Sequence, residues 1–275
     1  MAYRTVFKHI RPRPVSDGAG VRIKRLIGTP DLDHVDPFLL VDEFGSEDGA
    51  DYIKGFPSHP HRGIETVTYM LAGHMQHQDN QGRSGDLGPG DVQWMTAGRG
   101  IIHSEMPQQE NGLMRGFQIW VNLPAKDKMC APRYQDIKSD DIPVTEPVPG
   151  IKARVIAGQF NGIVGAVTGI VAKPLYLDIS WEAKGALEIA LPHDHSALCI
   201  VCEGSLLVAG DRVPKGDLAV LSVGDGVHLE AEAGTQALLL AAQPWHEPIA
   251  RHGPFVMNSR AELVQAVQDY QAGRF

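Results

Sequence analysis

Four residues of types that bind metal ions occur in this sequence as two pairs. His59 and His61 are separated by a single residue, and so are His103 and Glu105. On a β-strand, residues i and i+2 lie on the same face, so each pair can direct both side chains toward one point. Three neutral imidazoles and one carboxylate suit Fe(II), Mn, Co, Ni, Cu or Zn. The spacing therefore predicts one divalent metal ion held by two strands, and a six-coordinate ion would keep two positions for water or substrate.

The sequence around these pairs is typical of an all-β protein. Its 30 glycines and 19 prolines are spread along the chain and separate short apolar runs such as Phe38–Val41, Glu65–Leu71 and Gly116–Val121. Short strands with frequent turn signals predict a sandwich or a barrel. A helix is predicted only near the C-terminus. Ser259 and Glu262 there have the spacing of a capping box, and four apolar residues follow at helical spacing: Leu263, Val264, Val267 and Tyr270.

A polar, proline-rich segment over residues 126–148 predicts a linker between two domains, which we place at residues 1–135 and 136–275. Both halves contain an H-x-H pair, then a strand that ends in glycine, then a Gly-Asp turn. This common order predicts a duplicated β-barrel fold whose second copy has diverged. The first domain would bind the metal, and the second would be a degenerate copy that ends in the helix.

The second half also has residues that mimic the first metal site: His193, His195, His228 and Glu230. They could form a second site, or they could be histidines that a decayed copy has kept by chance. The residues that surround His103, such as Gly98 and Gly100, have no counterpart there. Because short motifs match by chance when their context is missing, the sequence leaves this second site open.

Long stretches of the chain resemble the pirin family of two-domain cupin proteins. The resemblance is carried by residues 59–69 (HPHRGIETVTY), by residues 88–107 (GPGDVQWMTAGRGIIHSEMP), and by shorter matches at residues 116–124 and 247–258. It implies two stacked cupin barrels of the jelly-roll type and one iron ion in the N-terminal barrel, with His59, His61, His103 and Glu105 as ligands. In many cupins the carboxylate ligand follows the H-x-H pair, where this chain has Glu65. In pirins it is the residue at Glu105, so we expect Glu65 to hydrogen-bond a ligand or a backbone amide.

The resemblance also implies an activity, that of a quercetin 2,3-dioxygenase. A flavonol such as quercetin and O₂ would then be the substrates, and Glu105 could accept the substrate proton, with Glu65 or a metal-bound hydroxide as the alternative base. A competing hypothesis is a non-enzymatic, iron-binding regulatory protein that binds transcription factors or metabolic enzymes. A third is a bicupin that acts on another small oxygenated substrate, because a fold does not fix its chemistry.

Composition narrows the classes of partner and location. The net charge is −8 without a concentrated basic patch, which argues against direct binding of nucleic acid. No apolar run approaches the length of a membrane span, and residues 1–14 contain no apolar signal-peptide core. Three cysteines do not predict a disulfide framework, so we expect a cytoplasmic protein, a monomer by default, with Cys199 and Cys202 as buried thiols.

The sequence also predicts where several other side chains near the motifs lie. His74 and His77 follow the turn at Gly73 and are expected to be exposed. Trp94, Met95 and Trp120 are candidates to line the metal cavity, although core packing is the favoured role for Trp120, because aromatic side chains mostly bury apolar area.

Overall fold

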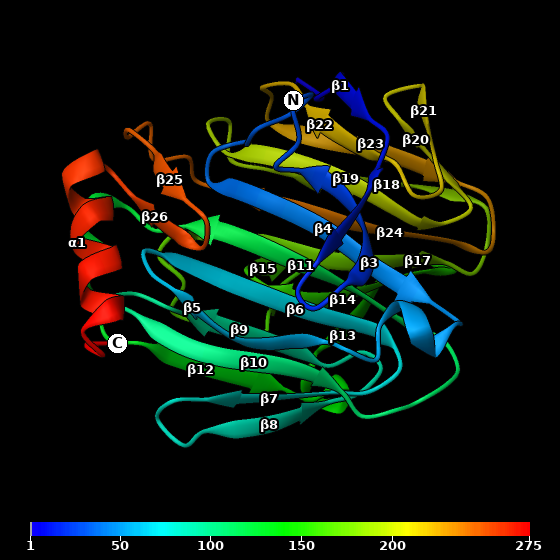
Figure 1. The fold of residues 1–275 in the computed structure, drawn as a ribbon. Helices are drawn as coiled ribbons and strands as arrows, with labels where there is room; N and C mark the ends of the chain where they lie inside the picture. The colour runs from blue at the N-terminus through cyan, green and yellow to red at the C-terminus, as the bar shows by residue number, and fades with distance from the viewer. Residues whose placement is uncertain (1) are drawn as a thin grey trace. The chain divides into compact units, whose positions relative to one another are not determined.

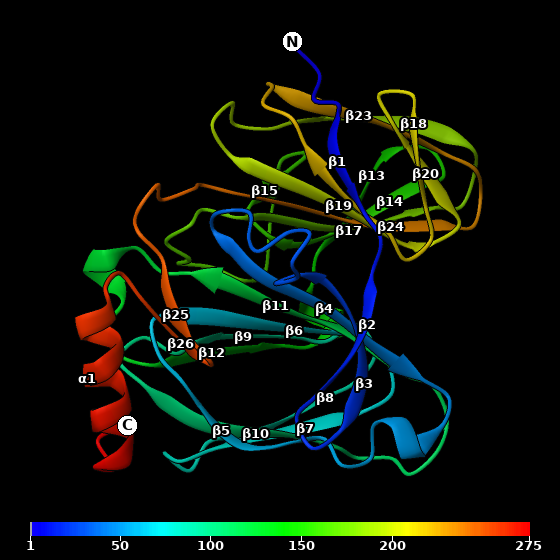
Figure 2. The same ribbon diagram turned by 45° about the horizontal axis from the view of Figure 1, so that its top comes forward.

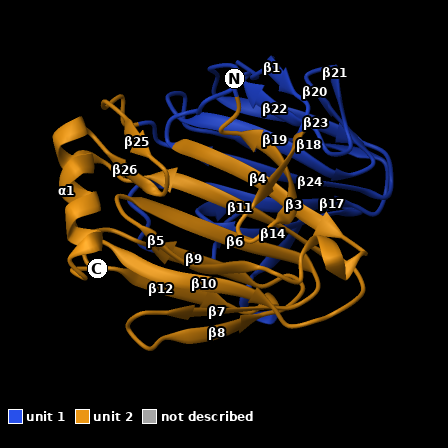
Figure 3. Cartoon of the chain, in the orientation of Figure 1, with its two compact units in different colours: residues 1–12, 30–37, 140–244 blue, residues 13–29, 38–139, 245–275 orange. Residues whose placement is uncertain are grey.

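The computed structural model describes residues 2–275 and divides the chain into two compact units. Unit 1 comprises residues 1–12, 30–37 and 140–244, and unit 2 comprises residues 13–29, 38–139 and 245–275 (Figure 3). The predicted boundary between residues 135 and 136 lies close to the junction at residues 139 and 140. The terminal segments, however, belong to the unit built by the other half of the chain, so the C-terminal helix is part of unit 2 (Figure 3).

Unit 2 contains a seven-stranded and a four-stranded antiparallel sheet (Figure 1). The larger sheet has the order β12 (Arg133–Ile137), β9 (Val92–Thr96), β6 (Ile64–Ala72), β11 (Met114–Asn122), β4 (Phe38–Ser46), β3 (Val21–Ile27) and β2 (Arg13–Asp17). The smaller has the order β5 (Phe56–His61), β10 (Ile101–Pro107), β7 (Met75–Asp79) and β8 (Ser84–Leu87). Short 3₁₀ helices span Gly49–Asp51 and Ala125–Asp127.

Unit 1 repeats this pair of sheets. Its seven-stranded sheet has the order β1 (Val6–Ile10), β22 (Leu218–Leu221), β19 (Ser196–Glu203), β24 (Thr235–Ala242), β17 (Leu175–Trp181), β14 (Ile151–Ala157) and β13 (Val144–Val148). Its four-stranded sheet has the order β18 (Gly185–Ala190), β23 (Gly226–Ala231), β20 (Ser205–Val208) and β21 (Asp211–Pro214), and a small hairpin joins β15 (Gln159–Phe160) to β16 (Ile163–Val164). The all-β expectation is confirmed, and the repeated sheet pattern agrees with a duplicated fold.

The C-terminal segment of unit 2 forms a hairpin and a helix. Strands β25 (Ala250–His252) and β26 (Phe255–Met257) pair with each other, and α1 (Arg260–Gln271) lies beside them in both views (Figures 1 and 2). Ser259 caps the helix by accepting a hydrogen bond from the backbone amide of Glu262, as the capping-box spacing predicts. None of the helices in residues 2–275 has the length and apolar character that crossing a membrane requires.

The segment that we expected to be a linker is partly regular structure. It contributes β12 to the edge of one sheet and β13 to the edge of another, with a 3₁₀ helix at Ser139–Asp141 between them. Neither strand shows a clear alternation of buried and exposed residues. Both lie at the edge of their sheets, where each pairs with only one other strand. Their polar composition therefore resembles that of a loop.

The interiors of the two units differ in chemistry. One continuous cluster of apolar, mostly aliphatic side chains fills unit 1, from Ile151 on β14 to Ala241 on β24. In unit 2 several polar side chains are buried on the strands of both sheets: His61, Thr66, Thr68, His77, Gln93, His103 and Glu105. Burial of polar groups costs free energy unless they find partners, so this concentration in unit 2 marks a candidate functional site.

Candidate metal centre

Three histidines on two paired strands of unit 2 converge on one point. His59 and His61 lie on β5, and His103 lies directly opposite His59 on β10. One ligand atom from each of the three imidazoles lies within 4.8 Å of the other two. The ring centroids are 4.5–5.1 Å apart. Among the described residues, this is the only group of three potential ligands that the structure brings together.

The hydrogen bonds of these imidazoles fit a metal ion. His59 Nδ1 lies 2.8 Å from the carbonyl oxygen of Pro57, which can only accept, so Nδ1 carries the proton and Nε2 presents its lone pair. His61 Nδ1 and both ring nitrogens of His103 are buried without a hydrogen-bond partner among the described residues. Buried nitrogens of this kind are rare in folded proteins, and a metal ion would satisfy them.

The protonation states point the same way. Burial lowers the pKa of His61 well below its usual value, and the neighbouring His59 adds to the effect. Burial likewise lowers the pKa of His103, with contributions from His61 and His59. Since a metal binds the neutral imidazole, both side chains are held in the form that coordinates.

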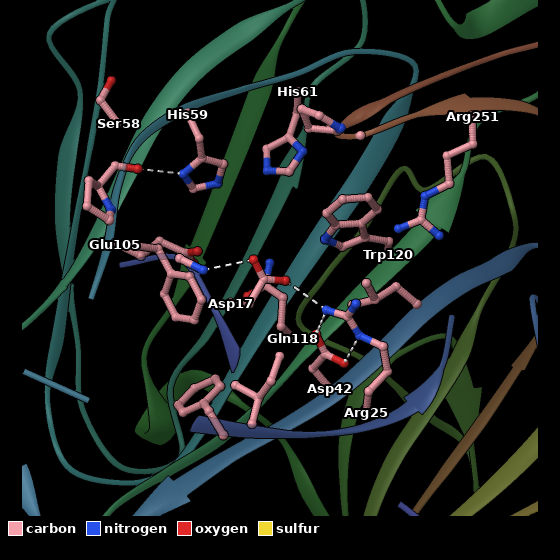
Figure 4. Close-up of a pocket in the computed structure, with 18 residues that line it drawn as sticks. Asp17, Arg25, Asp42, Ser58, His59, His61, Glu105, Gln118, Trp120 and Arg251 are labelled. Carbon is pink, nitrogen blue, oxygen red and sulfur yellow. Dashed lines mark hydrogen bonds and ion pairs between the residues drawn. The ribbon is translucent and has the colours of Figure 1, made fainter. Parts of the chain in front are cut away.

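Glu105 lies beside the histidines but outside their tight group. It shares the face of β10 with His103, two residues away, and it lines the same cavity as His59 and His61 (Figure 4). Thr68 on β6 donates a hydrogen bond of 2.8 Å to Glu105 Oε1. The carboxylate is therefore positioned at the cavity wall by a neighbouring strand, while its membership of the ligand set stays a prediction.

The cavity in front of these residues has a volume of about 540 Å³. Its walls combine the aromatic side chains of Phe44, Phe56 and Trp120 with polar groups (Figure 4). Trp120 packs edge-on against His61 at 5.1 Å and carries the guanidinium of Arg251 at 4.9 Å above its ring. Trp120 thus lines the cavity instead of serving only the core, whereas Trp94 and Met95 are buried and do not line it.

An arginine with two carboxylates forms the polar end of the cavity. Arg25 makes two hydrogen bonds of 2.8 Å to Asp42 and one of 2.7 Å to Asp17 (Figure 4). The bidentate pairing of Arg25 and Asp42 is strong and fixed in geometry. The sequence alone does not reveal this group, because the residues are far from the histidine motifs and only the pairing of β2, β3 and β4 brings them to the cavity.

The structure corrects the role expected for Glu65. Its carboxylate accepts a hydrogen bond of 2.7 Å from the Thr96 hydroxyl, which is neither a histidine ligand nor a backbone amide. Burial raises the pKa of Glu65 above its usual value, while the hydrogen bond from Thr96 opposes that rise. Gly63 has a φ of 80° and separates β5 from β6. The alternation of side chains between the two faces of β5 therefore does not continue from His61 to Glu65.

His77 also departs from the expectation that it is exposed, whereas His74 is exposed. The His77 side chain is 1% exposed, and its Nε2 lies 3.0 Å from Asp136 Oδ2 on β12. Tyr134 on the same strand stacks on its ring at 5.3 Å. Strand β12 covers His77 only because the expected linker joins the sheet, so the local sequence could not reveal this burial.

The second set of potential ligands does not converge within the described residues. The His193 side chain is 65% exposed and pairs with Asp225 at 2.9 Å. On β23, His228 and Glu230 alternate with the buried residues Val227 and Leu229, so they lie on the outer face of their sheet. The aliphatic core fills the space that a second metal would need. Cys199 and Cys202 are buried free thiols, as expected.

The fold and the site together define a two-domain cupin protein with a histidine cluster in one domain. The family model for pirin matches residues 20–121, and the model for the pirin C-terminal cupin domain matches residues 176–275. The chain belongs to the pirin family.

Relatives and solved structures support this assignment over the full length. The chain is 49% identical to a pirin-like protein of Caulobacter vibrioides, with all of both chains covered. It is 50% identical to a Pseudomonas aeruginosa protein named "Putative quercetin 2,3-dioxygenase", with 98% of each covered. A crystal structure of quercetin 2,3-dioxygenase from Acinetobacter baumannii superposes with a TM-score of 0.91 at 34% identity, covering 100% of this chain and 99% of that one.

Proposed function

We propose that this protein is a metal-dependent dioxygenase that cleaves flavonols such as quercetin with O₂. The observation that carries the proposal is the group of three converging imidazoles, two of which are buried, beside a cavity of about 540 Å³. Cavities of roughly 300–1,000 Å³ hold ligands of this size. The names of the full-length relatives and of the matched crystal structure support the same reaction class.

His59, His61, His103 and Glu105 would hold the metal, which we propose is Fe(II). When bound, a divalent metal supplies Lewis acidity toward the 3-hydroxyl and 4-carbonyl oxygens of a flavonol and the means to react with O₂. The imidazoles need no deprotonation to bind it, since burial already keeps His61 and His103 neutral. Mn, Co, Ni, Cu and Zn fit the same ligand types.

The side chains around the histidines would position the substrate and receive its proton. Phe44, Phe56 and Trp120 present aromatic surfaces on which planar rings can pack. Glu105 Oε1 is held by Thr68, which leaves Oε2 as the atom that can take the proton of the 3-hydroxyl. Glu105 is preferred over Glu65 as the base, because Glu105 lines the cavity and Glu65 does not.

The test combines metal content with quercetin consumption under air and under nitrogen. The variants are His59→Ala, His103→Ala and Glu105→Ala, and His193→Ala serves as a matched histidine control because its side chain is exposed and pairs with Asp225. We expect loss of metal and of oxygen-dependent turnover in the first two variants, and loss of turnover in the third. Full metal occupancy in both histidine variants would contradict the ligand assignment.

One bound metal per chain without turnover of quercetin would contradict the dioxygenase proposal while leaving the metal site in place. That result would favour an iron-binding regulatory protein, whose function resides in a surface that partner proteins contact.

A further inference from the structure

A row of polar side chains crosses four neighbouring strands at the cavity. Thr68 on β6 pairs with Gln118 on β11, which in turn pairs with Asp42 on β4. Asp42 pairs with Arg25 on β3. Residues that lie directly opposite each other on paired strands share one face of the sheet, and Gln118, Asp42 and Arg25 all line the cavity (Figure 4). Since Thr68 donates a hydrogen bond to Glu105, this polar row begins at the proposed metal centre.

The cavity wall on both sides of the polar row is apolar. Two residues away along each strand, the side chains that line the cavity are Leu40 and Phe44 on β4, Trp120 on β11 and Ile23 on β3. A mostly apolar wall with a few fixed polar groups is typical of a site that orients a bound molecule. The polar row is therefore a candidate for recognising polar atoms of the substrate away from the metal.

Asp42 is a buried carboxylate to which the proposed reaction assigns no role. Its side chain is 6% exposed, and each of its oxygens accepts one hydrogen bond of 2.8 Å from Arg25. A carboxylate can accept about four hydrogen bonds, two on each oxygen, so the guanidinium leaves one position on each oxygen. Burial raises the pKa of Asp42 above its usual value even though Arg25 opposes the rise. The ionised carboxylate would thus gain from a further donor.

Arg25 fixes the direction of this carboxylate. Its bidentate pairing with Asp42 is rigid, and its third hydrogen bond, of 2.7 Å, goes to Asp17 at the end of β2. Asp17 in turn accepts a hydrogen bond of 2.8 Å from the backbone amide of Gly18. An acceptor that is already held in place loses little conformational freedom when a ligand binds, so Asp42 is preorganised to receive a hydroxyl group.

We propose that Asp42 determines substrate specificity by accepting a hydrogen bond from a hydroxyl group on the phenyl ring attached to C2 of a flavonol. This inference rests on the proposed function, in which the 3-hydroxyl and 4-carbonyl oxygens face the histidines. Asp42 lies two strand spacings, ~10 Å, from Thr68, which itself contacts Glu105. A flavonol held by those two oxygens extends its phenyl ring over a comparable distance, so the site selects flavonols with hydroxyl groups on that ring.

The alternative role for Asp42 is purely structural, as an ion pair that joins β3 to β4. Two flavonols separate the roles: quercetin has two adjacent hydroxyl groups on the phenyl ring, and galangin has none but is otherwise identical. A buried acceptor that a ligand leaves unpaired penalises that ligand. A specificity role therefore predicts a preference for quercetin that depends on Asp42. A structural role predicts that loss of Asp42 affects both flavonols alike.

The experiment measures the affinity of quercetin and of galangin for the full-length, metal-loaded protein by isothermal titration calorimetry under nitrogen. We expect the wild type to bind quercetin about tenfold or more tightly than galangin, as a hydrogen bond to a charged group provides. In Asp42→Leu the ratio should fall to about one, with the affinity for galangin changed by less than about threefold. Asp42→Asn disturbs folding less and keeps a neutral acceptor. It should reduce a tenfold preference to about threefold, because charge-assisted hydrogen bonds are roughly twice as strong.

Glu43→Leu is the matched control. Glu43 is the next residue on β4, is likewise buried, and pairs with Arg115 at 2.7 Å, but it does not line the cavity. This variant also removes a buried carboxylate from an arginine, so we expect it to lose stability and to keep the wild-type preference for quercetin.

Three results would overturn the specificity proposal while leaving the proposed function in place. They are equal affinities of the wild type for the two flavonols, a preference for quercetin that persists in Asp42→Leu, and an equal loss of preference in Glu43→Leu. A wild-type protein that binds neither flavonol would overturn both proposals. Consumption of quercetin under air by the same samples tests the dioxygenase reaction separately from binding.

Discussion

Thr68 Oγ1 lies 2.8 Å from Glu105 Oε1, a contact that joins two strands across 37 residues of sequence. The same hydroxyl is 2.8 Å from Gln118 Oε1. A hydroxyl has one proton to donate, and the ionised carboxylate is the stronger acceptor, so Glu105 receives it. Thr68 is thereby the residue that sets the direction of the Glu105 carboxylate at the cavity wall.

Replacing this hydroxyl tests whether the orientation of Glu105 matters to the metal. We expect Thr68→Val, which preserves shape but removes the donor, to weaken metal binding by about 10- to 100-fold, as loss of such supporting hydrogen bonds typically does. Thr68→Ser keeps the hydroxyl and should stay close to the wild type. Competition with a chelator measures both affinities. Equal affinity in the valine variant and the wild type would show that Glu105 needs no such support.

The histidine pairs were predictable from the sequence because the geometry of a single strand relates residues two apart. His59, His61 and His103 come together as that rule requires. The rule does not extend from His61 to Glu65, which was not predicted to be a ligand, because it assumes an unbroken strand and Gly63 interrupts the strand with a left-handed backbone. A glycine in sequence is compatible with either conformation, so the spacing alone could not locate this break.

Features that depend on distant segments were not predictable. The burial of His77 arises from β12, and the polar end of the cavity arises from the pairing of β2, β3 and β4. The helix was predicted from its capping box and from the helical spacing of its apolar residues. That spacing shows which side of the helix is apolar, but it does not show whether the rest of the fold covers that side. The accessible face of α1, where Val264 is 51% exposed, is for that reason a finding of the structure.

Gly63 can be tested by a substitution that adds a single methyl group. A Cβ at this position would collide with the carbonyl oxygen of Val256, and the φ of 80° is itself unfavourable for alanine by about 1–2 kcal/mol. We expect Gly63→Ala to lose thermal stability and to bind metal more weakly, because the collision displaces the end of β5, where His61 lies. Thermal unfolding and metal titration provide the measurements.

Gly82 provides a matched control for this substitution. Its φ is 81°, and a Cβ there would meet nothing within 4 Å. Gly82→Ala therefore carries the same backbone cost without the collision. If the two variants lose equal stability and keep equal metal affinity, the close approach of Val256 does not position the ligand strand.

Lys128 connects the break at Gly63 to the C-terminal hairpin. It is fully buried, and its Nζ donates hydrogen bonds of 2.9 Å to the carbonyl oxygens of Gly63 and Val256 and of 2.7 Å to Asn122 Oδ1. Lys128→Met keeps the apolar stem but leaves three acceptors without this donor, which should cost about 3–5 kcal/mol. Urea unfolding measures the loss. Lys126→Met, at a side chain that is 76% exposed, should change stability little, and a similar loss there would exclude a specific role for Lys128.

The pair of His77 and Asp136 predicts a pH dependence of stability. Burial alone would raise the pKa of Asp136, but the hydrogen bond and charge interaction with His77, with smaller contributions from Gln93 and Lys138, outweigh burial and lower it below its usual value. A depressed folded-state pKa contributes stability above the unfolded-state pKa, near 4, and that contribution is lost as the pH falls toward the folded-state value. We expect Asp136→Asn to be less stable than the wild type at pH 7 by about 1–2 kcal/mol. The difference should shrink below about pH 4, where the wild-type carboxylate becomes protonated.

Urea midpoints of the metal-free proteins at pH 7 and below pH 4 test this prediction, since removing the metal excludes competition between protons and metal for the histidines. Asp140→Asn, at an exposed residue, should track the wild type at both pH values. A deficit in Asp136→Asn that stays constant with pH would show that the loss comes from packing and not from the charge of Asp136.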